Sequence, residues 1–147
     1  MSREIKFRVW DKIMEDIAPL VELHSDWVAI PIMDEGGGHL EQRKIEDVEL
    51  MQFTGLKDVN GVEIYEGDIV RFENKAYEIR FFNKWGMFGL VGQSNYKDFI
   101  KEDPLGSGGS STRYKPYVLG EYYQKRIEVV GNIYENKYLL VVLKEQK

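Results

Sequence analysis

Residues 53–72, FTGLKDVNGVEIYEGDIVRF, carry the densest turn signals in the chain and lead directly into a well-patterned strand. Asn60-Gly61 is the strongest of these signals, because both residues adopt positive φ at little steric cost. Gly67-Asp68 repeats the turn chemistry a little further on. Two tight reversals around a short segment predict a β corner rather than a helix. The complete turn signature that we predict consists of Gly55, Asn60, Gly61, Gly67, Asp68 and Gly131.

Alternating residues predict further short strands at 5–10, 48–53, 70–81 (a hairpin) and 127–133, and the largely apolar stretches at 27–33 and 84–91 predict two more. Pro31 places its strand at a sheet edge, because proline lacks the N–H that a central strand donates. The glycines that follow predict an exposed loop over 34–39. Many short strands, separated by Gly-rich turns and without a long helical period, predict a mainly β chain that closes as a barrel.

The length of 147 residues fits one globular unit or two intimately packed subdomains. We predict a small N-terminal β subdomain at residues 1–47, packed on a C-terminal β-barrel domain at residues 48–147. Gly and Ser dominate residues 104–113, which therefore predict a flexible loop on the barrel.

The composition excludes some chemistry. The chain has no cysteine, so it holds neither a disulfide nor a zinc–thiolate site, as in a reducing cytoplasm. It shows no signal peptide and no apolar run long enough to cross a bilayer. We therefore expect a soluble protein without a membrane partner.

No residue pattern indicates catalysis, a metal site or a cofactor. His24 and His39 are the only imidazoles, and no carboxylates stand at ligand spacing beside them. Glu63, Glu66 and Asp68 cluster in the corner, but Asp68 after glycine is typical of a turn residue that bonds nearby backbone. The glycine-rich loops lack the strand and helix that a phosphate cradle requires. We expect no enzyme activity.

The charges are unevenly distributed along the chain. Residues 1–68 carry 7 Lys+Arg and 16 Asp+Glu, whereas residues 69–126 carry 10 and 6. In the second segment the basic residues are interleaved with aromatic ones, a combination that binds single-stranded nucleic acid in small β-barrels. The same aromatic residues also serve as core or as protein-interface anchors. The candidate binding face consists of Arg71, Arg80, Lys84, Trp85, Tyr96, Arg113 and Tyr117.

Three motifs resemble the YopX family of bacteriophage and prophage proteins. They are TGLKDVNGVEIYEGDIV, REIKFRVWD near the start and VVGNIYEN near the end, in the family's order. The resemblance implies a small β protein of phage or prophage origin, located in the bacterial cytoplasm, with an SH3-like barrel in its C-terminal part. It implies no reaction, since the family provides no catalytic residues to carry over.

We therefore expect a non-enzymatic phage or prophage protein that acts by binding another protein. The partner is a phage or host protein, or a second copy of this chain in a homo-oligomer, because edge strands and surplus tyrosines favour pairing. The alternative is an accessory protein that binds nucleic acid through the basic, aromatic residues 71–126.

Overall fold

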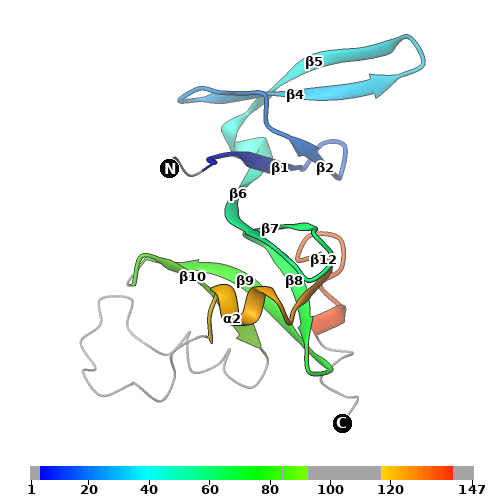
Figure 1. Ribbon diagram of the computed structural model, residues 1–147. Coiled ribbons are helices and arrows are strands. Elements are labelled where there is room, and N and C mark those ends of the chain that lie inside the picture. Colours follow the sequence, from blue (N-terminus) through cyan, green and yellow to red (C-terminus); the bar gives the residue numbers. More distant parts are fainter. Residues whose placement is uncertain (1–3, 84, 93–116, 141–147) are drawn as a thin grey trace. The chain divides into compact units, whose positions relative to one another are not determined.

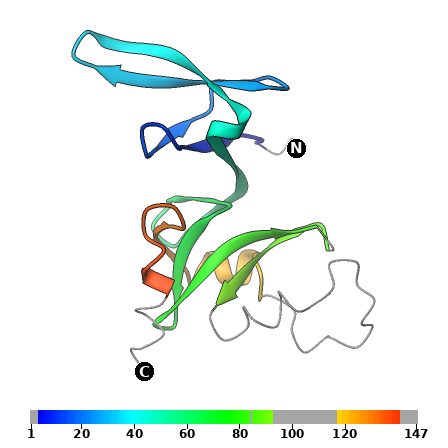
Figure 2. The same ribbon diagram turned by 180° about the vertical axis from the view of Figure 1, so that it is seen from behind.

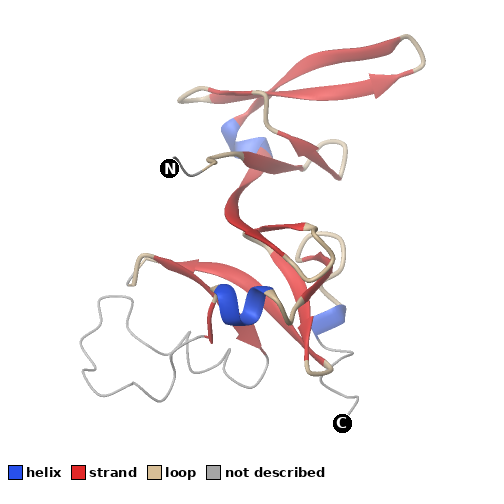
Figure 3. Cartoon of the chain, viewed as in Figure 1, coloured by secondary structure: helices blue, strands red, loops and turns tan. Residues whose placement is uncertain are grey.

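The computed structural model describes residues 4–83, 85–92 and 117–140, most of which lie in β-strands (Figures 1 and 3). The prediction of a mainly β chain is confirmed. The chain divides into two compact units, Met1–Phe53 (unit 1) and Thr54–Lys147 (unit 2), and the division lies inside strand β6. In the described part of the chain, no helix is long and apolar enough to cross a membrane. The flexible loop predicted at 104–113 lies outside the described residues.

Unit 1 is built from two small antiparallel sheets. In one, β1 lies between β2 and β6; in the other, β4 lies between β3 and β5. A single 3₁₀ turn, η1, joins β5 to β6. The elements are β1 (Phe7–Asp11), β2 (Asp16–Pro19), β3 (Glu22–Leu23), β4 (Trp27–Asp34), β5 (Gly37–Lys44), η1 (Ile45–Asp47) and β6 (Val48–Lys57).

The core of unit 1 follows from the two-residue period of its strands. Val28 and Ile30 point to one face of β4, where they are fully buried with Val9 of β1. Ala18 and Val48 complete the buried cluster. The apolar alternation read from the sequence therefore faces the core.

The hairpin of β4 and β5 corrects the loop predicted at 34–39. Strand β5 already begins at Gly37, and only two residues form the turn. The turn is stabilised by Asp34 Oδ1, which accepts a hydrogen bond of 2.9 Å from the Gly36 N–H. Gly37 has a φ of +108°, a backbone conformation that favours glycine. The glycines therefore begin a strand instead of forming a long loop.

The prediction that β4 is an edge strand is wrong, because β3 and β5 flank it. However, β3 pairs only with Val28 and Ala29 and ends before Pro31. From Ile30 onward, β4 therefore pairs on one side only. The side without a partner accommodates the proline that lacks an N–H.

Unit 2 centres on a five-stranded antiparallel sheet of order β11-β10-β9-β8-β12 (Figure 2). Four strands follow one another along the chain, and the last strand returns beside the first. A short helix precedes the return. The elements are β7 (Glu63–Tyr65), β8 (Asp68–Phe72), β9 (Lys75–Phe82), β10 (Met87–Gly92), β11 (Tyr117–Val118), α2 (Glu121–Gln124) and β12 (Glu128–Asn132).

One face of this sheet carries the core of unit 2. Val70, Tyr77, Ile79 and Leu90 are buried there, and the pairing register places them side by side. Residues from outside the sheet, including the fully buried Ile127, complete the cluster. The opposite face carries Arg71, Glu78 and Arg80 together with the buried apolar residues Ile69, Ala76 and Val91.

Candidate functional site

The turn signature has a structural role. Gly55, Gly61 and Gly67 have φ values between +81° and +88°, which side chains with a Cβ rarely adopt. Asn60, predicted to share this conformation, is not among the positive-φ residues. Asp68 is the buried first residue of β8, and its Oδ2 accepts a 2.7 Å hydrogen bond from the Tyr65 N–H across the preceding turn.

Asp58 organises this corner, although the sequence analysis passed over it. Its Oδ1 accepts hydrogen bonds of 2.8 Å from the N–H groups of Asn60 and Val62. Its Oδ2 accepts a 2.8 Å bond from Val129 N–H of β12, 71 residues later in the sequence. One buried carboxylate thus holds the turn and attaches it to the last strand of the sheet. The Asx-turn chemistry of Asp-Val-Asn-Gly was the signal available for the local half of this role.

Gly131 leaves room for the side chain of Asn136, which approaches the backbone of β12 closely. A Cβ on Gly131 would lie 2.5 Å from Asn136 Oδ1, much closer than a real Cβ contact. Asn136 Oδ1 also accepts a hydrogen bond of 3.2 Å from the Asn132 N–H, so its position is fixed. The last residue of the predicted signature therefore closes the turn after β12.

Two residues of the candidate binding face share one side of the sheet. Arg71 lies opposite Glu128 of β12 and opposite Ala76 of β9. Alternate residues of a strand share a face, so Ala76, Glu78 and Arg80 follow one another on that same side. Arg71 and Arg80 therefore lie on the face opposite the core.

Both arginines contact carboxylates. Arg71 Nη2 donates to Glu128 Oε2 at 2.6 Å, across the β8–β12 pair. Arg80 donates two hydrogen bonds to Glu78, of 3.2 Å from Nε and 3.1 Å from Nη2. The local charge of this face is therefore balanced by paired opposite charges rather than uniformly positive.

The other members of the candidate face are only partly described. Trp85 lies in the turn between β9 and β10, with its ring centroid 5.6 Å from that of Phe82. Tyr117 begins β11, where its backbone lies opposite Leu90. Lys84, Tyr96 and Arg113 lie outside the described residues. The structure thus brings Arg71 and Arg80 to one face and does not test the face as a whole.

Helix α2 presents an exposed aromatic residue that the sequence analysis did not select. Tyr122 has 59% of its surface exposed, and the Arg126 guanidinium lies 4.1 Å from its ring centroid. Arg126 Nη1 also donates a 2.7 Å hydrogen bond to the Tyr122 carbonyl oxygen. The ring also meets Tyr123 edge-on, with centroids 4.9 Å apart. Tyr122 therefore contacts two neighbours while it faces solvent.

In unit 1, a series of ionic contacts runs along β5 from the hairpin turn to the interior. We call Asp34, His39, Glu41, Arg43 and Asp11 the β5 ion ladder. Its successive contacts are Asp34 Oδ2–His39 Nδ1 at 3.2 Å, His39 Nε2–Glu41 Oε1 at 2.9 Å, Glu41 Oε2–Arg43 Nη1 at 2.6 Å and Arg43 Nε–Asp11 Oδ1 at 3.0 Å. Asp11 is only 1% exposed, so the inner end of the ladder is a buried ion pair.

The exposed end of the ladder changes the ionisation of its members. The pKa of His39 is raised above its ordinary value, first by the hydrogen bond to Glu41 and then by the charges of Asp34 and Glu41. The pKa of Glu41 is lowered, first by His39 and then by Arg43. The His39 contribution to stability is thus present at low pH and is lost as pH rises through the raised pKa. The Glu41 contribution is present above the ordinary carboxylate pKa and is lost as pH falls through the lowered one.

We expect an NMR titration of the His39 ring to give a midpoint above the usual histidine value, because protonation gains two carboxylate contacts. In the double variant Asp34→Asn/Glu41→Gln, the midpoint should move down toward the usual value. An identical midpoint in the variant and the parent protein would show that the ladder does not form at the hairpin turn in solution.

Neither histidine is part of a metal-binding cluster among the described residues. His24 stacks on Trp27 with ring centroids 3.7 Å apart, and its Nε2 lies 3.2 Å from Glu22 Oε2. His39 is held by the ion ladder. Both histidines therefore have structural neighbours that account for their positions.

Comparisons with known proteins agree with the fold. The sequence matches the family described as YopX protein over residues 6–141. The crystal structure of protein EF1440 from Enterococcus faecalis is similar with a TM-score of 0.54 and 24% identity, covering 95% of this chain and 99% of that one. The crystal structure of protein yopX from Bacillus subtilis gives a TM-score of 0.50 and 18% identity, covering 92% and 97%. At these identities the two structures support the fold alone. No curated protein matches the sequence.

Proposed function

The chain belongs to the YopX family, and from this premise we propose that it is a non-enzymatic protein that acts by binding another protein. We further propose that it is of phage or prophage origin and acts in the cytoplasm of the bacterial host. The partner is a phage or host protein.

The observation that carries this proposal is the charge balance of the sheet face of unit 2. Arg71 and Arg80 each contact a carboxylate on the same face. A nucleic-acid site gains affinity when cations replace the counterions of phosphates, and a neighbouring carboxylate opposes that gain. Paired opposite charges are instead compatible with the polar rim of a protein interface.

Tyr122 and Arg126 provide the residue types that such an interface needs. Tyrosine and arginine are enriched among the residues that dominate binding energy between proteins. The contacts of Tyr122 with Arg126 and Tyr123 restrict the ring before any partner arrives. A ring that is already ordered loses less conformational entropy on binding.

We also propose that unit 2 is an SH3-like barrel. The support is the strand order: a run of four consecutive strands is followed by α2, and β12 then pairs with β8. The hydrogen bond from Val59 N–H to the Ile127 carbonyl, 3.1 Å long, links the corner before β7 to the start of this last strand. This bond attaches the corner to the β12 edge of the five-stranded sheet.

Nucleic-acid binding is the second candidate, because Trp85 and Phe82 lie against each other near Arg80. Phe82 follows Arg80 by two residues in β9 and so shares its face. Aromatic rings beside cations are where single strands stack in small β-barrels.

To separate the two functions, a photo-crosslinking amino acid is placed at position 122 in protein produced in the bacterial host. The matched control is position 138, because Tyr138 is also a tyrosine of unit 2 and is 60% exposed. We expect one discrete protein adduct from position 122 and none from position 138.

The purified protein is then titrated with labelled single- and double-stranded oligonucleotides at low and near-physiological salt, with fluorescence anisotropy as the readout. The protein-binding proposal predicts no binding that survives the higher salt. Salt-resistant oligonucleotide binding, together with no adduct from position 122, would reverse the order of the two functions.

A further inference from the structure

The hairpin of β4 and β5 leaves a long strand edge open. Strand β5 is eight residues long and pairs only with β4 among the strands that the structure describes. The register with β4 is continuous over all eight pairs, without a bulge. In both views, the far half of the hairpin extends away from the other strands of unit 1 (Figures 1 and 2). Natural edge strands are usually short, bulged, interrupted by proline or protected by charges, and of these features β5 has only charges, at positions such as Lys44 and the inward-pointing Arg43.

The register identifies which backbone groups face outward from β5. The tight turn makes Asp34 and Gly37 a hydrogen-bonded pair, and hydrogen-bonded pairs alternate along an antiparallel ladder. The pair of Pro31 with Leu40 is then not hydrogen-bonded, as the missing proline N–H requires. The backbone N–H and C=O groups directed away from β4 belong to Gly38, Leu40, Gln42 and Lys44, and among them the Gln42 carbonyl already accepts a 3.3 Å hydrogen bond from Arg43 Nη1.

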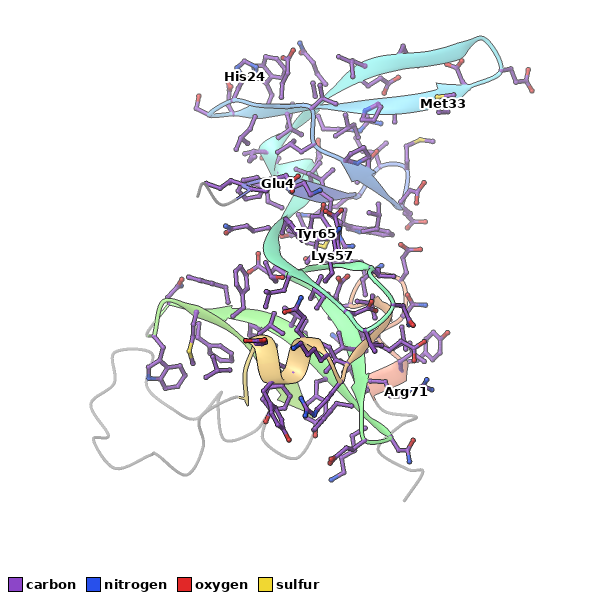
Figure 4. All side chains as sticks on the ribbon, in the orientation of Figure 1. Glu4, His24, Met33, Lys57, Tyr65 and Arg71 are labelled. Atoms are coloured by element: carbon purple, nitrogen blue, oxygen red, sulfur yellow. The ribbon has the colours of Figure 1, made fainter. Side chains whose placement is uncertain are left out.

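Apolar side chains lie beside this open edge. Met33 lies near the tip of the hairpin (Figure 4). It is 79% exposed, and Leu40 is 53% exposed. Leu40 lies opposite Pro31 on the hairpin face away from the core, and Met33 shares that face. A segment added along β5 would therefore gain apolar contact as well as backbone hydrogen bonds.

The charge around the edge is negative. Residues 1–53 contain 6 Lys+Arg and 12 Asp+Glu, a net charge of −6. On the hairpin itself, Asp34, Glu35 and Glu41 are at least partly exposed, and the Arg43 charge is turned inward to the buried Asp11. Lys44 is the only cation of β5 with an exposed side chain. A second copy of this acidic unit would meet like charge, whereas a basic segment would meet the opposite charge.

We propose that the open edge of β5 binds an extended, net-basic segment of a partner protein by strand addition. Main-chain hydrogen bonds supply affinity in this mode, and alternate side chains supply specificity. The β5 ion ladder supports the site, because it fixes the charged side chains of β5 on the core side. This inference rests on the proposed protein-binding function and adds to it a site and the chemistry of the partner.

The probe is the seven-residue peptide Lys-Val-Lys-Val-Lys-Val-Lys, and two peptides control for charge and for strand formation. One replaces every lysine with glutamate, and the other has proline at its centre. We expect the basic peptide to bind, to perturb the NMR signals of β5 and to slow amide hydrogen exchange at Gly38, Leu40, Gln42 and Lys44. Both control peptides should bind at least about tenfold more weakly.

Two variants at one position separate backbone from side chain. Leu40→Pro removes an outward N–H without removing a bond to β4, so it should lower the affinity for the basic peptide by about tenfold or more. Leu40→Ala keeps the N–H and should lower that affinity less. The unfolding midpoints of both variants check that the hairpin persists. If Leu40→Pro unfolds the protein, the comparison of the three peptides on the parent protein still tests the inference.

Three results would overturn the inference: no peptide binding at millimolar concentration, equal binding of the basic and acidic peptides, or a homodimer in sedimentation equilibrium that Leu40→Pro abolishes. If the peptides fail while position 122 still forms its protein adduct, the β5 site alone is refuted and the proposed function stands. Failure of both experiments would refute the function as well.

Discussion

Replacing Asp58 with alanine should lower the free energy of unfolding of unit 2 by about 3–5 kcal/mol. The substitution removes one buried acceptor that serves the N–H groups of Asn60, Val62 and Val129. Each buried donor that loses its partner costs about 1–3 kcal/mol, and the three donors lie close enough for their costs to overlap. The corner and β12 would lose their shared attachment at the same time.

The measurement is urea unfolding followed by tryptophan fluorescence. Trp85 is the only tryptophan after residue 53, so a Trp10→Phe/Trp27→Phe background reports on unit 2. Asp58→Asn retains one carbonyl oxygen and should cost less than Asp58→Ala. Glu121→Ala, at an exposed carboxylate of unit 2 that pairs with Lys125, makes the same change in charge and should stay within about 1 kcal/mol of the parent. If Asp58→Ala also stayed in that range, the carboxylate would not be what joins the turn to β12.

Replacing Arg43 with methionine should lower the stability of unit 1 by about 3–5 kcal/mol, because it leaves the Asp11 carboxylate buried without its counter-charge. Asp11 Oδ2 is buried and has no hydrogen-bond partner, so Oδ1 makes the contacts of this group. One of these is the 3.0 Å bond from Arg43 Nε, and another comes from the Ile13 N–H. The remaining backbone bond does not compensate a full buried charge.

A double variant tests the cause. Asp11→Asn/Arg43→Met removes both charges and retains an acceptor for Ile13, so it should recover much of the loss caused by Arg43→Met alone. In a Trp85→Phe background, Trp10 and Trp27 report on unit 1. Lys12→Met breaks an exposed ion pair with Glu49 and should cost less than about 1 kcal/mol. A double variant as unstable as Arg43→Met would show that the arginine acts through its packing and not through its charge.

Local turn chemistry was predictable because it is decided by residues close in sequence. Gly61 and Gly67 adopt positive φ because glycine has no Cβ, and the turn around each glycine requires that conformation. The strands at 5–10 and 27–33 were also readable, the first from its alternating residues and the second from its continuous apolar run, which is buried from Val28 to Ile30. These local rules identified the corner and a mainly β chain, and the family motifs identified the family.

The missed features depend on partners far away in the sequence. Asp58 is recognisable as a turn residue, but its bond to Val129 crosses 71 positions. Strand β5 begins with two glycines, which are poor strand formers, and its pairing with β4 overrides that local preference. The inward position of Arg43 depends on Asp11, 32 residues earlier. A single sequence carries no signal for such pairs.

The position of β12 beside β8 also determines when each unit can fold during synthesis on the ribosome. Unit 2 cannot complete its sheet until Val129 has emerged, because its first and last strands pair with each other. The β1–β2, β1–β6 and β4–β5 pairs of unit 1 all form within the first 53 residues and are available to fold much earlier. Pairing across so long a separation is slow, so nascent unit 2 exposes the apolar side of β8–β10 while it waits for its last strand.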